Sequence, residues 1–194
     1  MISIRNEKTT DVAAREALLD VAYGASRFKK PSEKIRRGRQ TADGLSLIAL
    51  DGGRIVGTVR LWHVSAGGAP ALLLGPLAVH PDYRCKGLGA SLMQRAIRNA
   101  RMRGHKAVLL VGDPEYYGRF GFSAEKTGTL AMPGDCPAHR LLALEFVHGT
   151  LDGAAGMVLA SGKLVPSRTR RIAAAAAAAM DVQPRLLQRV SHAA

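Results

Sequence analysis

Six consecutive residues have the types and spacing to bind phosphate. They follow an apolar stretch and read Arg84, Cys85, Lys86, Gly87, Leu88 and Gly89. The apolar spacing of residues 88–103 predicts an amphipathic helix, so the six positions lead into a helix start. Free N–H groups and partial positive charge at a helix start attract anions, and glycines allow a close approach. The pattern is typical of a pyrophosphate-binding turn.

Two better-known phosphate-binding sequences do not fit this turn. A Walker loop ends in Gly-Lys-Ser/Thr, whereas here Gly87 is followed by Leu88 and a further glycine. A Rossmann fingerprint requires a third glycine where this chain has Leu92. For the six residues taken alone, a strand-to-helix turn that binds no ligand stays an alternative.

Short strands and helices alternate around the turn. We expect strands at 2–5, 45–50, 54–64, 71–79, 106–111 and 140–147, and helices at 9–23, 31–40 and 88–103, with a short helix capped by Asp113. A helix joins the strand before the turn to the strand after it, which predicts a parallel pair inside a mixed α/β sheet. Because proline cannot donate to a sheet ladder, Gly75-Pro76 predicts lost pairing within the central strand.

The net charge of +13 is concentrated in two segments. Residues 27–39 carry seven basic side chains and one acidic one, and residues 163–194 carry six and one. Such segments fit nucleic acid, a membrane surface or an anionic ligand, while a solvated face is the simpler interpretation. No aromatic residue follows Phe146, so base stacking by the tail is not expected and nucleic acid is not predicted as a partner.

Composition points to a cytoplasmic protein without a membrane segment. Apolar residues make up 47% and charged residues 22% of the chain. No apolar run approaches the roughly 18 residues of a membrane span, and the first residues lack a signal peptide pattern. Cys85 and Cys136 form no disulfide framework. The six histidines are scattered, so no metal site is predicted.

The turn and the sequence behind it resemble the GCN5-related N-acetyltransferases (GNAT). Arg-x-x-Gly-x-Gly between an apolar strand and an amphipathic helix is similar to that family's acetyl-CoA signature. Tyr117, Gly121 and Phe122 match its Tyr-x-x-x-Gly-Phe ending. The wording of residues 112–122, with Leu-Ala-Leu-Glu at 142–145 and Leu-Asp-Gly at 151–153, is similar to the bacterial YhbS-like branch. The resemblance covers about residues 2–165.

The resemblance implies a GNAT-like fold, in which the central strand separates from its parallel neighbour and the pantetheine arm of acetyl-CoA enters the gap. It implies bonds from the cofactor to the backbone around Leu77, Ala78 and Val79. It further implies a pyrophosphate held by the amides of Arg84, Cys85, Lys86, Gly87, Leu88, Gly89 and Ala90. Many relatives have an asparagine near the place of Asp113 and Pro114, so no side-chain contact is implied there.

The resemblance also implies direct transfer of an acetyl group to an amine. Tyr117 aligns with the family's tyrosine acid, which protonates the departing CoA thiolate; an aromatic clamp without proton transfer is the alternative. No general base is evident. His63 is one histidine near the expected cleft, although a lone histidine on a strand is more often structural.

The acceptor is predicted to be a small-molecule or protein amine that lies against residues 23–40 and 65–70. The basic run there suits an acceptor with a carboxylate or phosphate. The alternative function is a non-catalytic acyl-CoA-binding regulatory module. We expect the transferase domain at residues 1–150, a family-like extension at 151–165 and a basic, alanine-rich tail at 166–194, and a homodimer stays open.

Overall fold

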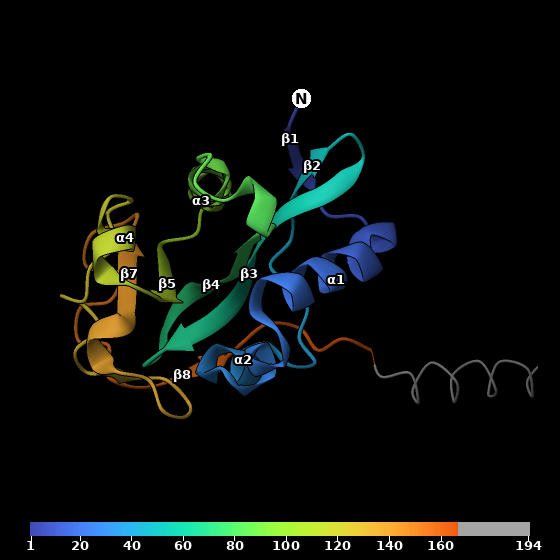
Figure 1. Ribbon diagram of the computed structural model, residues 1–194. Coiled ribbons are helices and arrows are strands. Elements are labelled where there is room, and N and C mark those ends of the chain that lie inside the picture. Colours follow the sequence, from blue (N-terminus) through green and yellow to red (C-terminus); the bar gives the residue numbers. More distant parts are fainter. Residues whose placement is uncertain (167–194) are drawn as a thin grey trace, which may run out of the picture. The chain divides into compact units, whose positions relative to one another are not determined.

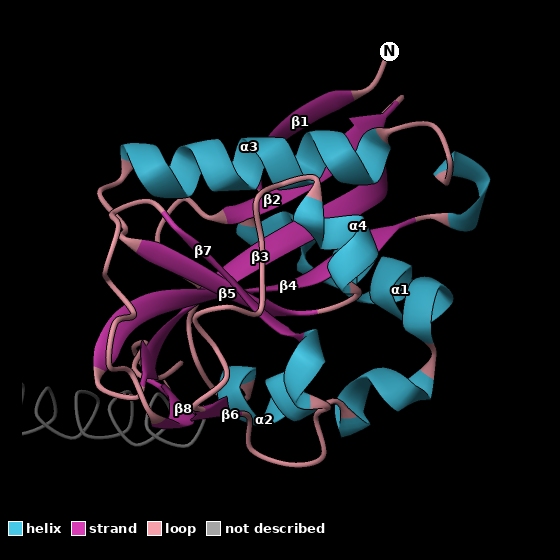
Figure 2. Ribbon diagram, turned by 90° about the vertical axis from the view of Figure 1, so that its left-hand side faces the viewer, coloured by secondary structure: helices cyan, strands magenta, loops and turns pink. Residues whose placement is uncertain are grey.

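The computed structural model describes residues 1–166, which contain a mixed sheet with helices on both faces (Figures 1 and 2). The chain divides into the units Met1–Lys163 and Leu164–Ala194, and the first unit holds all of the named strands and helices. The predicted alanine-rich tail, including the alanine run at 173–179, lies outside the described residues from position 167 onward.

The main sheet has the strand order β1-β2-β3-β4-β5-β7. Its strands are β1 (Ser3–Asn6), β2 (Ser46–Asp51), β3 (Arg54–Ala66), β4 (Ala69–Val79), β5 (Ala107–Val111) and β7 (Leu141–Glu145). Along this path only β4 and β5 pair in parallel, and α3 (Leu88–Met102) connects them. The predicted mixed α/β sheet with a central parallel pair is therefore confirmed.

Two strands were not predicted. β8 (Gly156–Ala160) pairs with the end of β3 and with the short strand β6 (Leu130–Ala131). The first of these strands falls in the stretch expected as an extension, so that stretch contributes to the same sheet. Met157 and Leu159 on β8 are exposed while Val158 is buried. Because both faces of this strand carry apolar residues, apolar and polar residues do not alternate and the sequence shows no strand period.

The helices cover opposite faces of the sheet (Figures 1 and 2). The α3 helix lies on one face and buries Leu88, Leu92, Met93, Ala96 and Ala100, the predicted apolar stripe apart from Ile97, which is only partly buried. A Cβ at Gly57 on β3 would lie 2.8 Å from the Leu92 side chain, so this glycine allows the helix its close approach. The α1 helix (Val12–Tyr23) packs Leu18 against Ile48 and Ile55 on the other face.

The second predicted helix is shorter and less polar than expected. The α2 helix (Pro31–Arg36) ends four residues early, because Arg37 leaves the helical conformation and Gly38 has φ +69°. Ile35 packs in the core, and Arg36 is buried as well. The burial of Arg36 was not predicted; its guanidinium pairs with Glu33 on the same short helix at 3.1 Å.

The parallel strands β4 and β5 pair over only two positions, Leu72 with Val108 and Leu73 with Leu109. Next along β4, Gly75 and Pro76 have no partner on β3 either, because the register passes from Leu74 directly to Leu77. The Gly75–Pro76 peptide bond is cis, and the Trp62 indole donates to the Gly75 carbonyl at 2.6 Å. The predicted loss of pairing is confirmed, and β4 and β5 share no pairs beyond it.

Candidate active site

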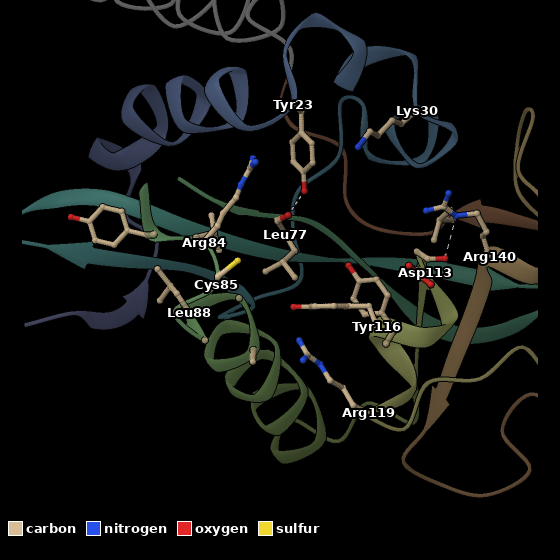
Figure 3. Close-up of a pocket in the computed structure, with 18 residues that line it drawn as sticks. Tyr23, Lys30, Leu77, Arg84, Cys85, Leu88, Asp113, Tyr116, Arg119 and Arg140 are labelled. Atoms are coloured by element: carbon tan, nitrogen blue, oxygen red, sulfur yellow. Dashed lines mark hydrogen bonds between the residues drawn. The ribbon is translucent and has the colours of Figure 1, made fainter. Parts of the chain in front are cut away.

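A cavity of about 760 Å³ lies where β4 and β5 have separated (Figure 3). One part of its lining comes from the end of β4 and the turn before α3. Another comes from the end of β5 and the short helix α4 (Pro114–Gly118). The third comes from the end of α1, the connection to α2 and the residue before β7. Segments distant in sequence thus meet at the carboxyl ends of the parallel strands, where open α/β sheets bind ligands.

The turn before α3 presents unpaired backbone donors. The first helical bond runs from the Ser91 N–H to the Gly87 carbonyl at 3.0 Å, so the N–H groups of Leu88, Gly89 and Ala90 have no helical acceptor. Cys85 and Gly87 have φ values of 59° and 75°. Left-handed residues alternating with others turn successive N–H groups toward one side, which is the geometry of an anion-binding nest.

The two basic side chains of the turn behave differently. Arg84 lines the cavity and extends toward the end of α1, with its guanidinium 3.5 Å from the Ala22 carbonyl. Lys86 does not line it, because its ammonium donates to the Asp82 carbonyl at 2.8 Å and lies 5.4 Å from the Tyr83 ring. Arg84 is therefore the side-chain cation that the turn offers to the cavity.

Backbone groups of β4 alternate between the sheet and the cavity. The His80 N–H donates to the Val56 carbonyl at 2.9 Å, so His80 and, two residues earlier, Ala78 direct their polar groups to β3. Leu77 and Val79 direct theirs to the opposite side, and both line the cavity, whereas Ala78 is buried and does not. The Leu77 carbonyl accepts a hydrogen bond from the Tyr23 hydroxyl.

Tyr117 is held at the cavity by helix α4. Asp113 caps this helix by accepting from the Glu115 N–H at 3.1 Å, and proline occupies the next position, as the sequence predicted. The Tyr117 ring packs 6.3 Å from Phe122, and a Cβ at Gly112 would lie 2.1 Å from it. Burial raises the pKa of the Tyr117 phenol to about 12, with smaller contributions from Tyr23 and Tyr116.

Cations lie on the side of the cavity opposite the turn. In Figure 3, Lys30 and Arg140 lie to the right, and Arg84 lies to the left. The Lys30 ammonium is 4.0 Å from the centre of the Tyr23 ring. Its pKa is lowered, first by burial and then by the charges of Arg36 and Arg140. The Arg140 side chain is fixed to the end of β5, where Nε donates to the Gly112 carbonyl at 3.3 Å.

The comparison with protein families now decides the class of the chain. Residues 14–122 match the model of the acetyltransferase (GNAT) family. The chain belongs to the GNAT family of acetyltransferases. The match includes the phosphate turn, both parallel strands and Tyr117, so the predicted resemblance is confirmed.

This GNAT chain is similar to two curated N-acetyltransferases of Escherichia coli. It is 33% identical over 125 residues to the uncharacterized N-acetyltransferase YhbS, covering 61% of this chain and 72% of YhbS. It is 30% identical over 105 residues to the uncharacterized N-acetyltransferase YjhQ, covering 52% of this chain and 58% of YjhQ. The predicted likeness to the YhbS branch is confirmed, and the chain is classed as an N-acetyltransferase.

Solved structures agree with this fold. The crystal structure of E. coli YhbS in complex with CoA matches at a TM-score of 0.69 and 28% identity, covering 82% of this chain and 89% of YhbS. A GNAT acetyltransferase from Brucella melitensis in complex with acetyl-CoA has a TM-score of 0.59 at 23% identity, with 87% and 97% covered. The second likeness supports the fold alone.

Nine of the eleven predicted site residues of this GNAT protein line one cavity. They are Leu77, Val79, Arg84, Cys85, Gly87, Leu88, Gly89, Ala90 and Tyr117. The other two, Ala78 and Lys86, face elsewhere for the reasons given above. The cavity is also lined by Tyr83, Arg119 and Arg140, which sequence reasoning missed, and by Tyr23 and Lys30, which fall in the segment 23–40 predicted to face the acceptor. Two of these carried a signal, since Lys30 lies in the basic run and Arg119 in the quoted Tyr-Tyr-Gly-Arg-Phe motif.

His63 and the loop at 65–70 do not line the GNAT cavity, which for His63 agrees with the structural role that the sequence favoured. His63 pairs with Leu72 in the sheet, and its ring centre is 5.4 Å from that of His105. The loop at 65–70 lies at the opposite end of β4, where a Cβ at Gly67 would meet the backbone of Ala155 at 2.4 Å.

The described residues 1–166 show neither a metal-binding cluster nor a helix suited to a membrane. They contain no group of three or more His, Cys, Asp and Glu side chains arranged to hold a metal ion. None of the helices in this part of the chain combines the length and apolar character that crossing a bilayer requires.

Proposed function

We propose that this protein transfers the acetyl group of acetyl-CoA directly to an amine. The observation that carries the proposal is the short pairing of β4 with β5, which ends at Leu73 and Leu109. Beyond that point, free backbone groups of β4, the phosphate turn and Tyr117 face the same cavity. The CoA named with the similar YhbS crystal structure supports this choice of donor.

The backbone supplies most of the proposed cofactor contacts. The N–H groups of Leu88, Gly89 and Ala90, with those of the preceding turn, would bind the pyrophosphate, and Arg84 would add charge. The polar groups of Leu77 and Val79 would bond to the pantetheine arm as a neighbouring strand does. Lys86 would contribute through its backbone N–H alone, because its side chain is bonded to the Asp82 carbonyl, and Ala78 would place its two neighbours.

The proposed reaction balances without a covalent enzyme intermediate. The amine nitrogen attacks the thioester carbonyl carbon, an N–C bond forms and the C–S bond breaks. The nitrogen loses one proton and the CoA sulfur gains one. The Val79 N–H points to the cavity and would polarise the carbonyl oxygen as negative charge develops on it.

Tyr117 is the proposed donor to the CoA sulfur. Its pKa of about 12 keeps the phenol protonated throughout the neutral range. A phenol with such a high pKa is a weak acid, so we propose that it donates a hydrogen bond to the developing thiolate and stays protonated. The proton that the sulfur gains is the one that the amine nitrogen loses. Its neighbour Tyr116 carries the Arg119 guanidinium 4.0 Å from its ring centre and is assigned to packing at the cavity mouth.

Calorimetric titration with acetyl-CoA tests the proposal. Wild type should bind with a Kd in the micromolar range, and Gly87→Glu should weaken binding by at least about 100-fold, since it places a carboxylate at the phosphate site. Gly104→Glu is the matched control at the other end of α3. The two glycines have φ values of 75° and 78°, and a Cβ at either meets nothing within 4 Å, so backbone strain is equal. Absence of binding by wild type, or equal binding by the two variants, would overturn the proposal.

A further inference from the structure

Lys30 and Arg140 are two cations that share one side of the cavity without a salt-bridge partner among residues 1–166. They come from different parts of the chain. Lys30 precedes α2, and Arg140 ends the short 3-10 turn Ala138–Arg140 before β7. Both side chains line the same cavity as Tyr117 and lie on the same side of it in Figure 3, and the charge of Arg140 contributes to the lowered pKa of Lys30. Both therefore lie close to the proposed reaction centre.

The rest of the basic run is arranged differently. Arg27 pairs with Glu16 at 2.6 Å and with Asp20 at 2.9 Å, and Arg36 pairs with Glu33. Arg39 donates to the Gly162 carbonyl at 2.8 Å. Of the seven basic residues of the run, Lys30 is the one that lines the cavity. The run is therefore not one surface patch, and its single contribution to the site has no neutralising partner within the part of the chain that is described.

Uncompensated positive charge at this position is unfavourable for the empty protein. Burial and two neighbouring guanidinium groups all disfavour the charged form of Lys30. Asp113 is the one carboxylate among the lining residues that the structure describes, and it already accepts from the Glu115 N–H at the start of α4. An anionic group that entered between Lys30 and Arg140 would remove the repulsion and gain two charge-assisted hydrogen bonds.

We propose that the acceptor is an amine that also carries a carboxylate or phosphate, and that Lys30 and Arg140 bind that anionic group. This inference rests on the proposed acetyl transfer. Arg84, on the other side of the cavity, remains for the phosphates of the cofactor. The same cations would repel polyamines and other acceptors whose only charges are positive. They thus select the acceptor by charge, while the free amine is presented to the thioester.

A panel of matched amines tests this choice of acceptor. CoA release from acetyl-CoA is measured with amino acids and their carboxamides, and with phosphoethanolamine and glucosamine 6-phosphate against ethanolamine and glucosamine. We expect at least one anionic amine to exceed its neutral counterpart about tenfold or more in kcat/KM, in line with the usual effect of a charged pair. The carboxylate and phosphate arms show which anion is preferred.

Four variants locate the effect. Lys30→Gln and Arg140→Gln should each raise the KM for the preferred anionic amine about tenfold and leave the Kd for acetyl-CoA within twofold. Lys29→Gln is the control, because it removes an adjacent charge that does not line the cavity. Lys30→Arg should restore most of the lost affinity.

The outcomes separate the two proposals. Two outcomes overturn the inference and leave the cofactor assignment intact, provided that the protein binds acetyl-CoA. In the first, neutral amines are acetylated as well as anionic ones; in the second, none of the anionic amines causes CoA release. Loss of acetyl-CoA affinity in Lys30→Gln and Arg140→Gln also overturns it, since the cations would then serve the cofactor. A wild-type protein that fails to bind acetyl-CoA removes the proposed function and the inference together.

Discussion

The two sides of the cavity are built in different ways. The proposed cofactor side offers backbone groups from the end of β4 and the start of α3, which are close in sequence and fixed by a strand end and a helix start. The acceptor side uses side chains, of which Lys30 and Arg140 are more than a hundred residues apart. The first side depends mainly on local backbone geometry, whereas the second depends on residue identity at positions that only the tertiary structure brings together.

This difference explains how one fold could serve many acceptors. Backbone donors persist when neighbouring side chains change, so the donor site tolerates sequence drift around its glycines. Side chains on connecting segments can be replaced without disturbing the sheet, so the acceptor site is free to vary. Tyr117 and Tyr23 both line the cavity, so substitutions at these tyrosines and their neighbours test whether the two sides act separately.

The largest effect is expected from Tyr117→Phe. Loss of the hydroxyl should lower kcat about 100-fold, equivalent to about 2.7 kcal/mol, because the leaving sulfur loses its donor. Affinity for acetyl-CoA should stay within twofold, since the cofactor side is built from backbone. Steady-state kinetics on the best amine of the panel, together with calorimetry, measure both quantities.

Tyr116→Phe is the matched control for that prediction. It removes a hydroxyl from the adjacent residue, whose ring centre is 4.9 Å from that of Tyr117, and should change kcat less than threefold. Equal losses in the two variants would mean that neither hydroxyl is a specific donor. Unchanged turnover in Tyr117→Phe would show that Tyr117 acts as an aromatic clamp without donating to the sulfur.

The same contrast explains which parts of the site could be predicted from the sequence. The phosphate turn and Tyr117 were predicted because local spacing specifies a helix start and a motif. Pro76 predicted the lost pairing, since proline lacks a donor whatever surrounds it. Arg140 had no signal, because nothing local distinguishes it from other surface arginines. The directions of the Ala78 and Lys86 side chains could not be predicted, since strand alternation and a competing carbonyl decide them.

A second prediction concerns the burial of the Tyr117 hydroxyl. Its folded pKa of about 12 exceeds the ordinary value of 10.0, so the folded state holds the proton more tightly. The resulting stabilisation is complete below pH 10 and is lost as pH rises from about 10 through 12. At about pH 11, wild type should have lost about 1 kcal/mol more stability than Tyr117→Phe, relative to neutral pH. Urea unfolding of both proteins measures the difference, and parallel pH curves would show that the hydroxyl is solvated.

The smallest expected effect concerns the link between the two sides. The Tyr23 hydroxyl, at the end of α1, donates to the Leu77 carbonyl on β4 and so ties the acceptor side to the cofactor strand. Tyr23→Phe should cost about 1 kcal/mol of stability, as the loss of one hydrogen bond does, and raise the acceptor KM about threefold through a looser α1 end. Tyr83→Phe is the comparison, since it removes a hydroxyl that donates to Asp51 at 2.8 Å, away from Lys30. It should cost similar stability in urea unfolding and leave the acceptor KM unchanged. Equal rises in KM for both variants would show that the acceptor side responds to general loosening, and that Tyr23 is no specific link.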